Sequence, residues 1–366
     1  MSDLKKLVHA LSSAAGQSSD SVTNDVIVAA EAHGVAKLLH DLQHEAGNHE
    51  LPQQVSHRLL EIARQHTAIE MARMLGIRQV LTSLNAAGIP VLLLKGSALA
   101  YWLYENPAQR SRCDLDILVA DIGSAKRATA ALQKIGYSLS FDAADESAEF
   151  EVALEGSLPG GVLNRVDLHW RLLNHAQLAD GLRFADLEAS AISISALACD
   201  ARGLDCANAL LHALLHRITN MASGQHNRLI WLYDIHLLAL RCRDPEWTGL
   251  LNQADRLHCA TACLDGLRAT RDVFNTSLPE SVDRTLETQS CLEGWRLGDG
   301  LDQGAMDRAH LRALRWPEKM GWLRRKFFPS RQFMRYRYSV VGVAGFCKAY
   351  VGRWWTGLMR AVGRGL

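Results

Sequence analysis

The sequence lacks any run of 18 apolar residues, and this absence argues against a transmembrane helix. Its first residues, Met-Ser-Asp-Leu-Lys-Lys, do not provide the apolar core that a signal peptide needs. It also lacks a Cys-x-x-Cys pair, and its 8 cysteines are scattered. In a chain of this length such cysteines are typical of reduced core residues. We therefore expect a protein of the bacterial-type cytoplasm.

The sequence also lacks an excess of charge of either sign. The formal net charge is +1, which argues against a nucleic-acid partner held by bulk charge. No internal repeat and no long low-complexity linker interrupts the sequence. With 366 residues and an ordinary hydrophobic fraction of 48%, the chain is long enough for two or three subdomains and a sizeable core.

The stretch from residue 89 to 119 combines the features of a ligand site. Val91–Leu94 is a short apolar run, as expected for a strand covered on both faces. Gly96 allows a sharp turn and the close approach of a ligand. Ser97 suits the N-cap of a helix over Ala98–Tyr104, whose free N–H groups would attract phosphate.

Asp114 and Asp116 follow in a second apolar strand, Asp114–Val119. Because they are two residues apart, both carboxylates point to one face. Adjacent carboxylates repel each other and raise each other's pKa, so the pair indicates a site for a divalent metal. The alternative is a solvated strand edge where Asp residues discourage aggregation. The neighbouring Lys-Gly-Ser turn and the arginines favour the metal site.

Further elements follow from local patterns. The region 21–84 has the apolar spacing of two or three helices, and residues 1–20 are expected to be mobile. Asp121 should cap a helix that runs to Lys134 and ends at Gly136. A third strand is predicted at Tyr137–Phe141, before a hairpin that turns at Leu158–Gly161.

The second strand of this hairpin contains Val-Asp-Leu-His-Trp, in which Asp167 and His169 share one face. Asp167 is therefore a candidate third carboxylate beside Asp114 and Asp116. An isolated surface Asp is the alternative.

Histidines elsewhere give weaker signals. His33, His40 and His44 lie on or near one amphipathic helix and are interpreted as structural or solvated. From Cys206 to about Leu278 the pattern is again helical, and His212 and His216 are four apart, a spacing that can hold a metal. No Glu accompanies them in a His-Glu-x-x-His motif, so packing or contact with the nucleotide site is favoured.

Several of these motifs together resemble a known family. Gly96-Ser97 followed by Asp114-Leu115-Asp116-Ile117 resembles the signature of the DNA polymerase β-like nucleotidyltransferase superfamily. A closer resemblance, over about residues 25–340, is to the bacterial uncharacterised nucleotidyltransferase family. It is carried by the motifs Leu94-Lys95-Gly96, Leu103-Tyr104, Arg110, Asp114–Val119, Gly136-Tyr137 and Val166–Arg171. The helix around Leu229–Leu238, with Asp234 as a candidate buried salt-bridge partner or part of a base-binding wall, is also similar.

The resemblance implies an α+β fold with a small mixed sheet, flanked by helical regions. The expected divisions are an N-terminal helical region (1–84), a nucleotidyltransferase core (85–190), a C-terminal helical region (191–313) and a basic, aromatic-rich tail (314–366). It also implies transfer of an NMP from an NTP to an unidentified hydroxyl or phosphate acceptor on a small molecule, peptide or protein, with Mg²⁺ as cofactor.

In this interpretation Asp114, Asp116 and Asp167 hold Mg²⁺, which prefers oxygen ligands, and Asp167 also helps to deprotonate the acceptor. Gly96 and Ser97 bind the outer phosphates. Lys95, Arg110 and Arg112 neutralise the triphosphate, unless they are solvated surface charges. Two alternatives stay open: a non-catalytic nucleotide-binding or antitoxin-like module, and a kinase-like phosphotransferase.

The C-terminal tail differs from the rest. From Lys319 onward the sequence has eleven lysines and arginines and no acid, so against a net charge of +1 the preceding residues sum to −10. Aromatic residues, among them Phe327, Phe328, Trp354 and Trp355, lie between these cations. The imbalance favours a tail that docks on its own chain, with Phe327, Phe328 and Tyr336 in a groove. An anionic membrane surface is the second interpretation, and an acidic partner or nucleic acid the third.

Overall fold

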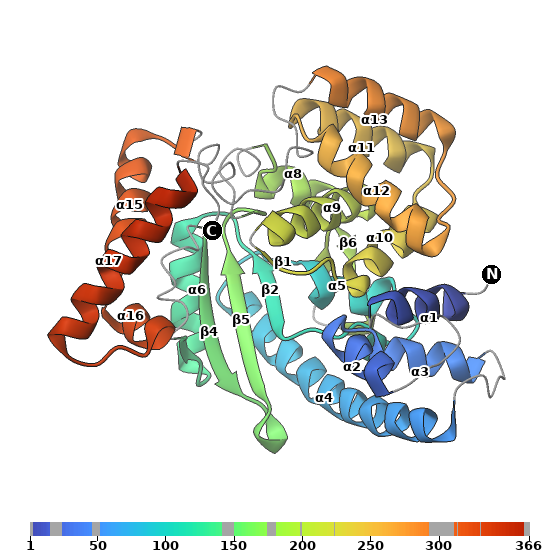
Figure 1. Cartoon of the computed structure of the whole chain (residues 1–366), viewed down its shortest axis with the longest axis horizontal. Helices are drawn as coiled ribbons and strands as arrows, with labels where there is room; N and C mark the ends of the chain where they lie inside the picture. The colour runs from blue at the N-terminus through green and yellow to red at the C-terminus, as the bar shows by residue number, and fades with distance from the viewer. Residues whose placement is uncertain are drawn as a thin grey trace.

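A seven-stranded mixed sheet lies at the centre of the computed structural model, and helices pack around it (Figure 1). The structure describes residues 3–14, 24–45, 52–140, 150–173, 181–197, 200–222, 224–292, 311–312, 314–329 and 331–361. The strands are β1 (Leu92–Leu93), β2 (Asp114–Leu118), β3 (Ser138–Leu139), β4 (Glu151–Ser157), β5 (Leu163–His169), β6 (Ile192–Ser193) and β7 (Arg202–Gly203). The α+β class expected from the sequence is confirmed.

The helices form three groups along the chain. Before the sheet lie α1 (Asp3–Ala14), α2 (Asn24–Ala32), α3 (Ala36–Glu45) and α4 (Gln53–Ala86). Within and after the sheet lie α5 (Lys95–Trp102), α6 (Ile122–Lys134), α8 (Phe184–Ala189), α9 (Cys206–Ala222), α10 (Leu229–Arg241), α11 (Asp244–Arg256), α12 (Ala260–Phe274) and α13 (Glu280–Leu292). The last described helices are α15 (Trp316–Phe327), α16 (Arg331–Tyr338) and α17 (Gly342–Ala361).

The strand order is β3-β4-β5-β2-β1-β7-β6. The β4–β5 hairpin turns at Leu158–Gly161 as expected, and β5 runs parallel to β2. Beyond residue 190, β6 and β7 extend the sheet next to β1. The predicted strands at 91–94, 114–119 and 137–141 correspond to β1, β2 and β3, and residue 141 lies outside the described residues.

The sheet separates two apolar cores, because alternate side chains of a strand point to opposite faces. Leu92 and Leu118 belong to the core formed with the N-terminal and C-terminal helices. Leu93 and Ile117, one residue along each strand, belong to the core formed with α4 and α6. The interpretation of 91–94 as a strand covered on both faces is thereby confirmed.

Helix α6 shows how local chemistry sets an element's ends. The Asp121 side chain accepts a hydrogen bond from the Ser124 backbone N–H at 2.6 Å, which satisfies one free donor of the first turn. After Lys134 the chain reverses at Gly136, whose φ of +94° favours glycine. Both ends lie where the sequence predicts them.

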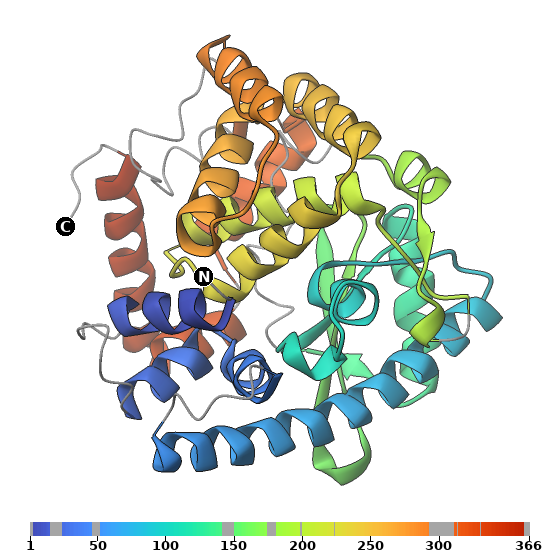
Figure 2. The ribbon, with the colours of Figure 1, turned by 90° about the vertical axis from the view of Figure 1, so that its right-hand side faces the viewer.

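Helix α1 corrects the expectation that residues 1–20 are mobile. Residues 3–14 form a helix, and residues 15–20 lie outside the described residues. Leu7 and Leu11 are fully buried in the helical core, against helices α2, α3 and α12. The Ser/Ala/Gly composition concealed this amphipathic pattern, whose partner α12 comes much later in the chain. Figure 2 shows α1 beside α2 and α3, with α4 along one edge of the molecule.

The cysteines are only partly core residues. Within the described residues, seven are free thiols; Cys259 and Cys263 are buried, whereas Cys113, Cys291 and Cys347 are exposed. The expectation of core cysteines is therefore wrong for these three, although no described cysteine forms a disulfide. None of the described helices is sufficiently long and apolar to cross a membrane.

The C-terminal tail does not place Phe327 and Phe328 in a groove of its own chain, as the favoured interpretation expects. Helices α15–α17 contact one another, and Phe327 and Phe328 are exposed by 44% and 62% instead of filling a groove. The side chain of Tyr336 lies outside what the structure describes. The charge imbalance alone could not show that the aromatic residues of these short helices would be left at the surface.

We predict that Leu11→Ala lowers the free energy of unfolding by about 2–5 kcal/mol, because it leaves a cavity in a fully packed core. Val28→Ala, on the neighbouring helix α2 and 64% exposed, is the matched control and should change stability by less than about 0.5 kcal/mol. Urea unfolding followed by circular dichroism measures both. Equal midpoints for the two variants would mean that α1 does not pack on the body.

Candidate metal centre

Three carboxylates meet where β2 and β5 lie side by side. Asp114 and Asp116 come from β2 and Asp167 from β5, and the parallel register pairs Asp116 directly with Asp167. Side-chain oxygens of all three lie within 4.8 Å of one another. The intervening Leu115 and Ile117 are buried in the apolar core on the opposite face. The expected shared face, and the expected third acid, are thus where the sequence places them.

Two cationic groups compensate the central carboxylate. Lys95 Nζ lies 2.6 Å from Asp116 Oδ1, and His169 Nε2 lies 2.9 Å from the same oxygen. The other ring nitrogen of His169, Nδ1, lies 3.1 Å from Glu151 Oε2. Asp116 is therefore the most strongly ion-paired of the three acids. Arg165, two residues before Asp167 on β5, donates from Nε to Asp167 Oδ1 at 2.9 Å.

These contacts shift the pKa of Asp116 downward and those of Asp114 and Asp167 upward. Burial opposes ionisation of Asp116, yet Lys95 and His169 hold the pKa of this carboxyl well below its usual range. The charge of Asp116, and then burial, raise the pKa of Asp114 to about 6. Burial, followed by the charge of Asp116, also raises the pKa of Asp167. The carboxylates of Asp114 and Asp167 are therefore repelled by Asp116 in spite of the cations around them.

His169 remains a cation at neutral pH. Burial and Lys95 act to lower its pKa, but the hydrogen bonds to Asp116 and Glu151 outweigh them and raise it to about 9. Burial likewise disfavours the charged form of Lys95, and the nearby Asp116 and Asp114 raise its pKa above the ordinary value.

The Lys-Gly-Ser turn differs in detail from the expected helix start. Helix α5 begins at Lys95 rather than Ala98, and its N-cap is Leu94, which offers no side-chain cap. Lys95 itself adopts φ +49°, a conformation that costs a non-glycine residue about 1 kcal/mol or more. The proposed N-cap role of Ser97 is therefore wrong, because the backbone turns and the helix begins at Lys95, two residues before Ser97.

Ser97 instead joins α5 to β2. Its hydroxyl donates to the Asp114 carbonyl at 3.2 Å and accepts from the Asp116 backbone N–H at 3.1 Å, and the residue has no exposed surface. Both bonds hold the backbone on either side of Leu115. Ser97 thus fixes the segment that carries two of the carboxylates.

Arg110 and Arg112 lie in buried ion pairs. Arg110 Nε donates to Asp234 Oδ1 at 2.8 Å, and the Tyr104 hydroxyl donates to the same oxygen. Arg112 Nη2 lies 2.7 Å from Glu70 Oε1. The favoured interpretation of Asp234, a buried partner that anchors its helix, is confirmed. Both arginines brace the loop before β2 from opposite sides.

Gly96 makes room for one of these pairs. A Cβ at residue 96 would lie only 3.1 Å from Arg110 Cζ, so the guanidinium lies directly over the glycine. The close approach expected at Gly96 is therefore occupied, in this structure, by the protein's own Arg110.

Arg73 on α4 and Arg228 at the start of α10 were missed by sequence reasoning. Both are partly buried and close enough to Asp114 for their charges to interact. Burial lowers the pKa of both guanidinium groups. The charge of Arg112 lowers the pKa of Arg73 further, and the charge of Arg110 does the same to Arg228. Within the described part of the chain, neither has a carboxylate at ion-pair distance, and Arg228 Nε is buried without a hydrogen-bond partner.

Contacts with the rest of the protein nonetheless hold both arginines in place. Arg73 Nη1 donates to the Arg112 carbonyl, and Arg228 lies over the Trp231 ring at 5.7 Å. Gly34 leaves the space that Arg228 fills, since a Cβ there would lie 2.6 Å from Arg228 Nη2. The only local signal for Arg228 is its place directly before the apolar run from Leu229, and Arg73 has none beyond its predicted helix.

The histidines are structural. His33 Nδ1 accepts a hydrogen bond from the Leu229 backbone N–H at 3.2 Å, which caps α10. His212 and His216 border a narrow cavity of about 20 Å³ that Lys95, Arg110 and Asp234 also line. Burial, and then Lys95, lower the pKa of His212 to about 3, and the pKa of His216 is also well below its usual range. Both rings are therefore neutral packing groups beside the carboxylates.

Comparison with known proteins adds one match. Neither the curated proteins nor the solved structures include one that matches this chain. Among protein families, the model described as "uncharacterised nucleotidyltransferase" matches residues 20–275, which include β2, β5 and the side chains of the candidate metal centre. The match covers more than half of the sequence, and the chain therefore belongs to the uncharacterised nucleotidyltransferase family.

Proposed function

We propose that this protein is a Mg²⁺-dependent nucleotidyltransferase of the polymerase β-like kind, which transfers an NMP from an NTP to a hydroxyl or phosphate of an acceptor. The observation that carries the proposal is the set of three carboxylates on two hydrogen-bonded strands, with oxygens within 4.8 Å of one another. Nucleotidyl transfer needs a cluster of this kind to bind a hard cation beside the triphosphate.

The residues fit a divalent cation on two grounds. All three donors are carboxylate oxygens, which Mg²⁺ prefers. In addition, the raised pKa of Asp114, caused first by the charge of Asp116, means that the two carboxylates still repel each other beside Lys95 and His169, and a divalent cation would relieve that repulsion. When bound, Mg²⁺ would stabilise the negative charge that develops on the attacking and leaving oxygens.

The protein's own groups then have separate tasks. In the reaction, an acceptor oxygen bonds to the α-phosphorus, the bond to the pyrophosphate oxygen breaks, and the acceptor proton leaves. Asp167 is the best-placed base for that proton, because its raised pKa increases its proton affinity and Arg165 fixes its orientation. Asp114 and Asp116 serve as ligands, and His169 orients Asp116.

For the triphosphate we propose Arg73 and Arg228 as the principal cations, with Lys95 nearest the carboxylates. Their guanidinium groups are partly buried near Asp114 and are not paired with acids among the described residues, so an anionic ligand would offset the repulsion of Arg73 by Arg112 and of Arg228 by Arg110. Arg110, Arg112, Gly96 and Ser97, which the sequence assigned to phosphate, are proposed instead to position β2 and Lys95. Both arginines are already paired with buried acids, Ser97 is bonded to the β2 backbone, and the Arg110 guanidinium covers Gly96.

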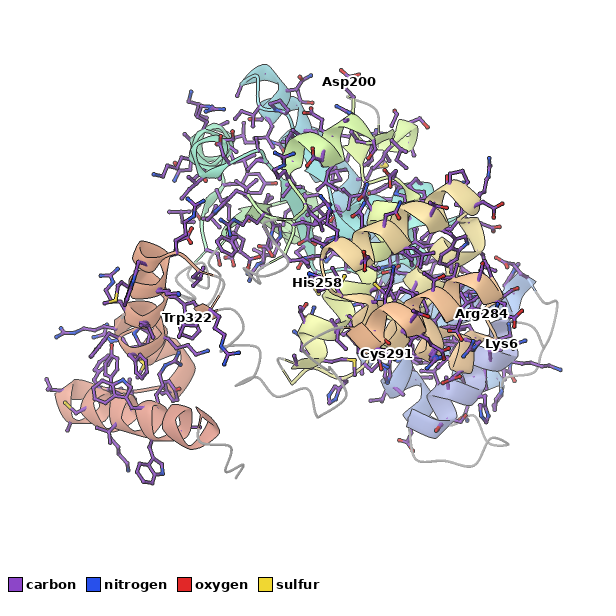
Figure 3. The ribbon with its side chains drawn as sticks, turned by 90° about the horizontal axis from the view of Figure 1, so that it is seen from above. Lys6, Asp200, His258, Arg284, Cys291 and Trp322 are labelled. Atoms are coloured by element: carbon purple, nitrogen blue, oxygen red, sulfur yellow. The ribbon has the colours of Figure 1, made fainter. Side chains whose placement is uncertain are left out.

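We predict pyrophosphate release in a screen of the four NTPs with Mg²⁺, and its loss by at least about 100-fold in Asp116→Asn and Asp167→Asn. Asp200→Asn is the matched control: Asp200 is exposed at the surface, and its φ of +53° suits Asn equally well (Figure 3). Wild-type activity in Asp116→Asn would refute the metal assignment. Binding of NTP without turnover would favour the non-catalytic module, and release of NDP the kinase-like reaction.

We predict that Asp114→Asn stabilises the protein at pH 7 in EDTA by about 3 kcal/mol. Because the folded-state pKa of about 6 lies above the ordinary value of 3.8, the charged carboxylate destabilises the fold above pH 6. This penalty is nearly complete at pH 6 and fades as the pH falls from 6 to 3.8, and below 3.8 both states are protonated, so the variant should then equal the wild type.

Melting temperatures of both proteins between pH 5 and pH 8 measure this effect. Saturating Mg²⁺ should reverse the order at pH 7, because the wild type gains ligand-linked stability that the variant loses. A variant that is less stable than the wild type at every pH in EDTA would show that Asp114 is not destabilised by its neighbours.

Arg73→Ala and Arg228→Ala are each expected to weaken NTP binding by about 10-fold to 100-fold, since a hydrogen bond to a charged group is worth about 1.5–3 kcal/mol. Arg58→Ala, on the same helix as Arg73 but exposed and paired with Glu61, should leave it unchanged. Thermal shift with NTP and Mg²⁺ reads out affinity, because ligand at 100 times Kd adds about 2.7 kcal/mol of stability. Undiminished shifts in both variants would locate the triphosphate elsewhere.

A further inference from the structure

Helices α15, α16 and α17 form a small unit beside the body of the protein (Figure 3). Its inner side is well packed: Met334 is fully buried, Arg353 Nε donates to the Lys326 carbonyl at 3.1 Å, and the Trp354 indole donates to the Phe327 carbonyl. These bonds fix one side of α17 against the end of α15.

The unit touches the body near its start. Leu314 is buried with Phe150, and Trp170 and Trp322 pack against this pair. Figure 3 shows Trp322 on the edge of the unit nearer to the body. Because this attachment lies at the beginning of the unit, it leaves the side of α17 that faces away from α15 and α16 open to solvent.

The open side of α17 is apolar, the reverse of an ordinary surface helix. Val343, Cys347, Val351 and Trp355 recur at intervals of four, so they share one face, and every one of them is exposed. Val343 is 82% exposed, Val351 60% and Trp355 61%. Exposed apolar surface that is continuous along a helix marks a contact site.

The unit that carries this face is strongly positive. No acidic residue follows Glu318 in the sequence. The cations of the unit whose side chains the structure describes are Lys319, Arg324, Lys326, Arg331, Arg335, Lys348 and Arg353. Lys348 lies next to Trp355 around the circumference of α17, at the border of the apolar face. Apolar and tryptophan side chains bordered by lysine and arginine are the composition of a helix that lies in a membrane interface.

We propose that the α15–α17 unit docks the protein on the surface of an anionic lipid bilayer. Val343, Val351 and Trp355 would enter the boundary between headgroups and acyl chains, and the cations would lie among the lipid phosphates. A second copy of the chain fits less well, because two faces of the same charge repel each other. Nucleic acid would match the cations but not the valines.

The test is sedimentation of the full chain with vesicles of phosphatidylcholine alone or with about 30% phosphatidylglycerol, at low and high salt. We expect binding to the anionic vesicles that falls as salt rises, and at least about tenfold weaker binding to the neutral ones. Val351→Ser/Trp355→Ser should weaken anionic binding at least about tenfold, and Lys348→Gln about fivefold.

Leu139→Ser/Leu163→Ser is the matched control, since both leucines are exposed, by 52% and 56%, on the sheet of the body. It should bind like the wild type. A circular dichroism melt checks that each variant folds. A second measurement is the quenching of tryptophan fluorescence by brominated lipid. Weaker quenching in Trp355→Phe than in the wild type would place the Trp355 indole in the bilayer without relying on a destabilised variant.

Three results would overturn the proposal. The first is no sedimentation with anionic vesicles at low salt, and the second is equal loss of binding in the tail and control variants. The third is a dimer, seen by light scattering without vesicles, that Val351→Ser/Trp355→Ser dissociates, because a second copy would then cover the face.

Discussion

The structure depends above all on how one buried carboxylate is compensated. Asp116 receives Lys95 at 2.6 Å and His169 at 2.9 Å, and without such partners an ionised group at this depth would be too costly to bury. The same charge raises the pKa of Asp114 and Asp167 beside it. A fully neutralised interior would be more stable, but it would have no use for a cation. The family to which the chain belongs is consistent with this compromise between stability and function.

Several interactions around Asp116 serve to keep β2 in place. Ser97 bonds to the backbone on both sides of Leu115, while Arg110 and Arg112 reach buried acids on α10 and α4. These contacts involve three different helices, so charge and hydrogen bonds, together with the buried Tyr104 and Ala108, hold the loop before β2. Such a buried polar network favours one arrangement of the loop. Arg73 and Arg228 stand apart from it, because they contribute charge without an acidic partner in the described structure.

What the sequence predicted was local in origin. The alternation in β2 and β5, the Asp121 cap and the Gly136 stop each depend on neighbours within a few residues, and all were placed correctly. What it missed depends on distant partners. Arg73 is brought to Asp114 by the packing of α4, and Leu11 becomes a core residue only because α12 covers it. The start of α5 was misplaced because Lys95 takes up a left-handed conformation that no motif indicates.

The pairing of Asp116 with Asp167 has a consequence for how this chain can change by insertion and deletion. The two acids meet because Asp114–Leu118 of β2 and Arg165–His169 of β5 are aligned residue by residue. One residue gained or lost inside β5, before Asp167, would turn its acid toward the apolar core and bring Val166 or Leu168 to the polar face. The Leu158–Gly161 turn is free of this constraint, because it lies beyond the paired residues. Length variation compatible with the carboxylate cluster should therefore collect in that turn and be absent from the two strands.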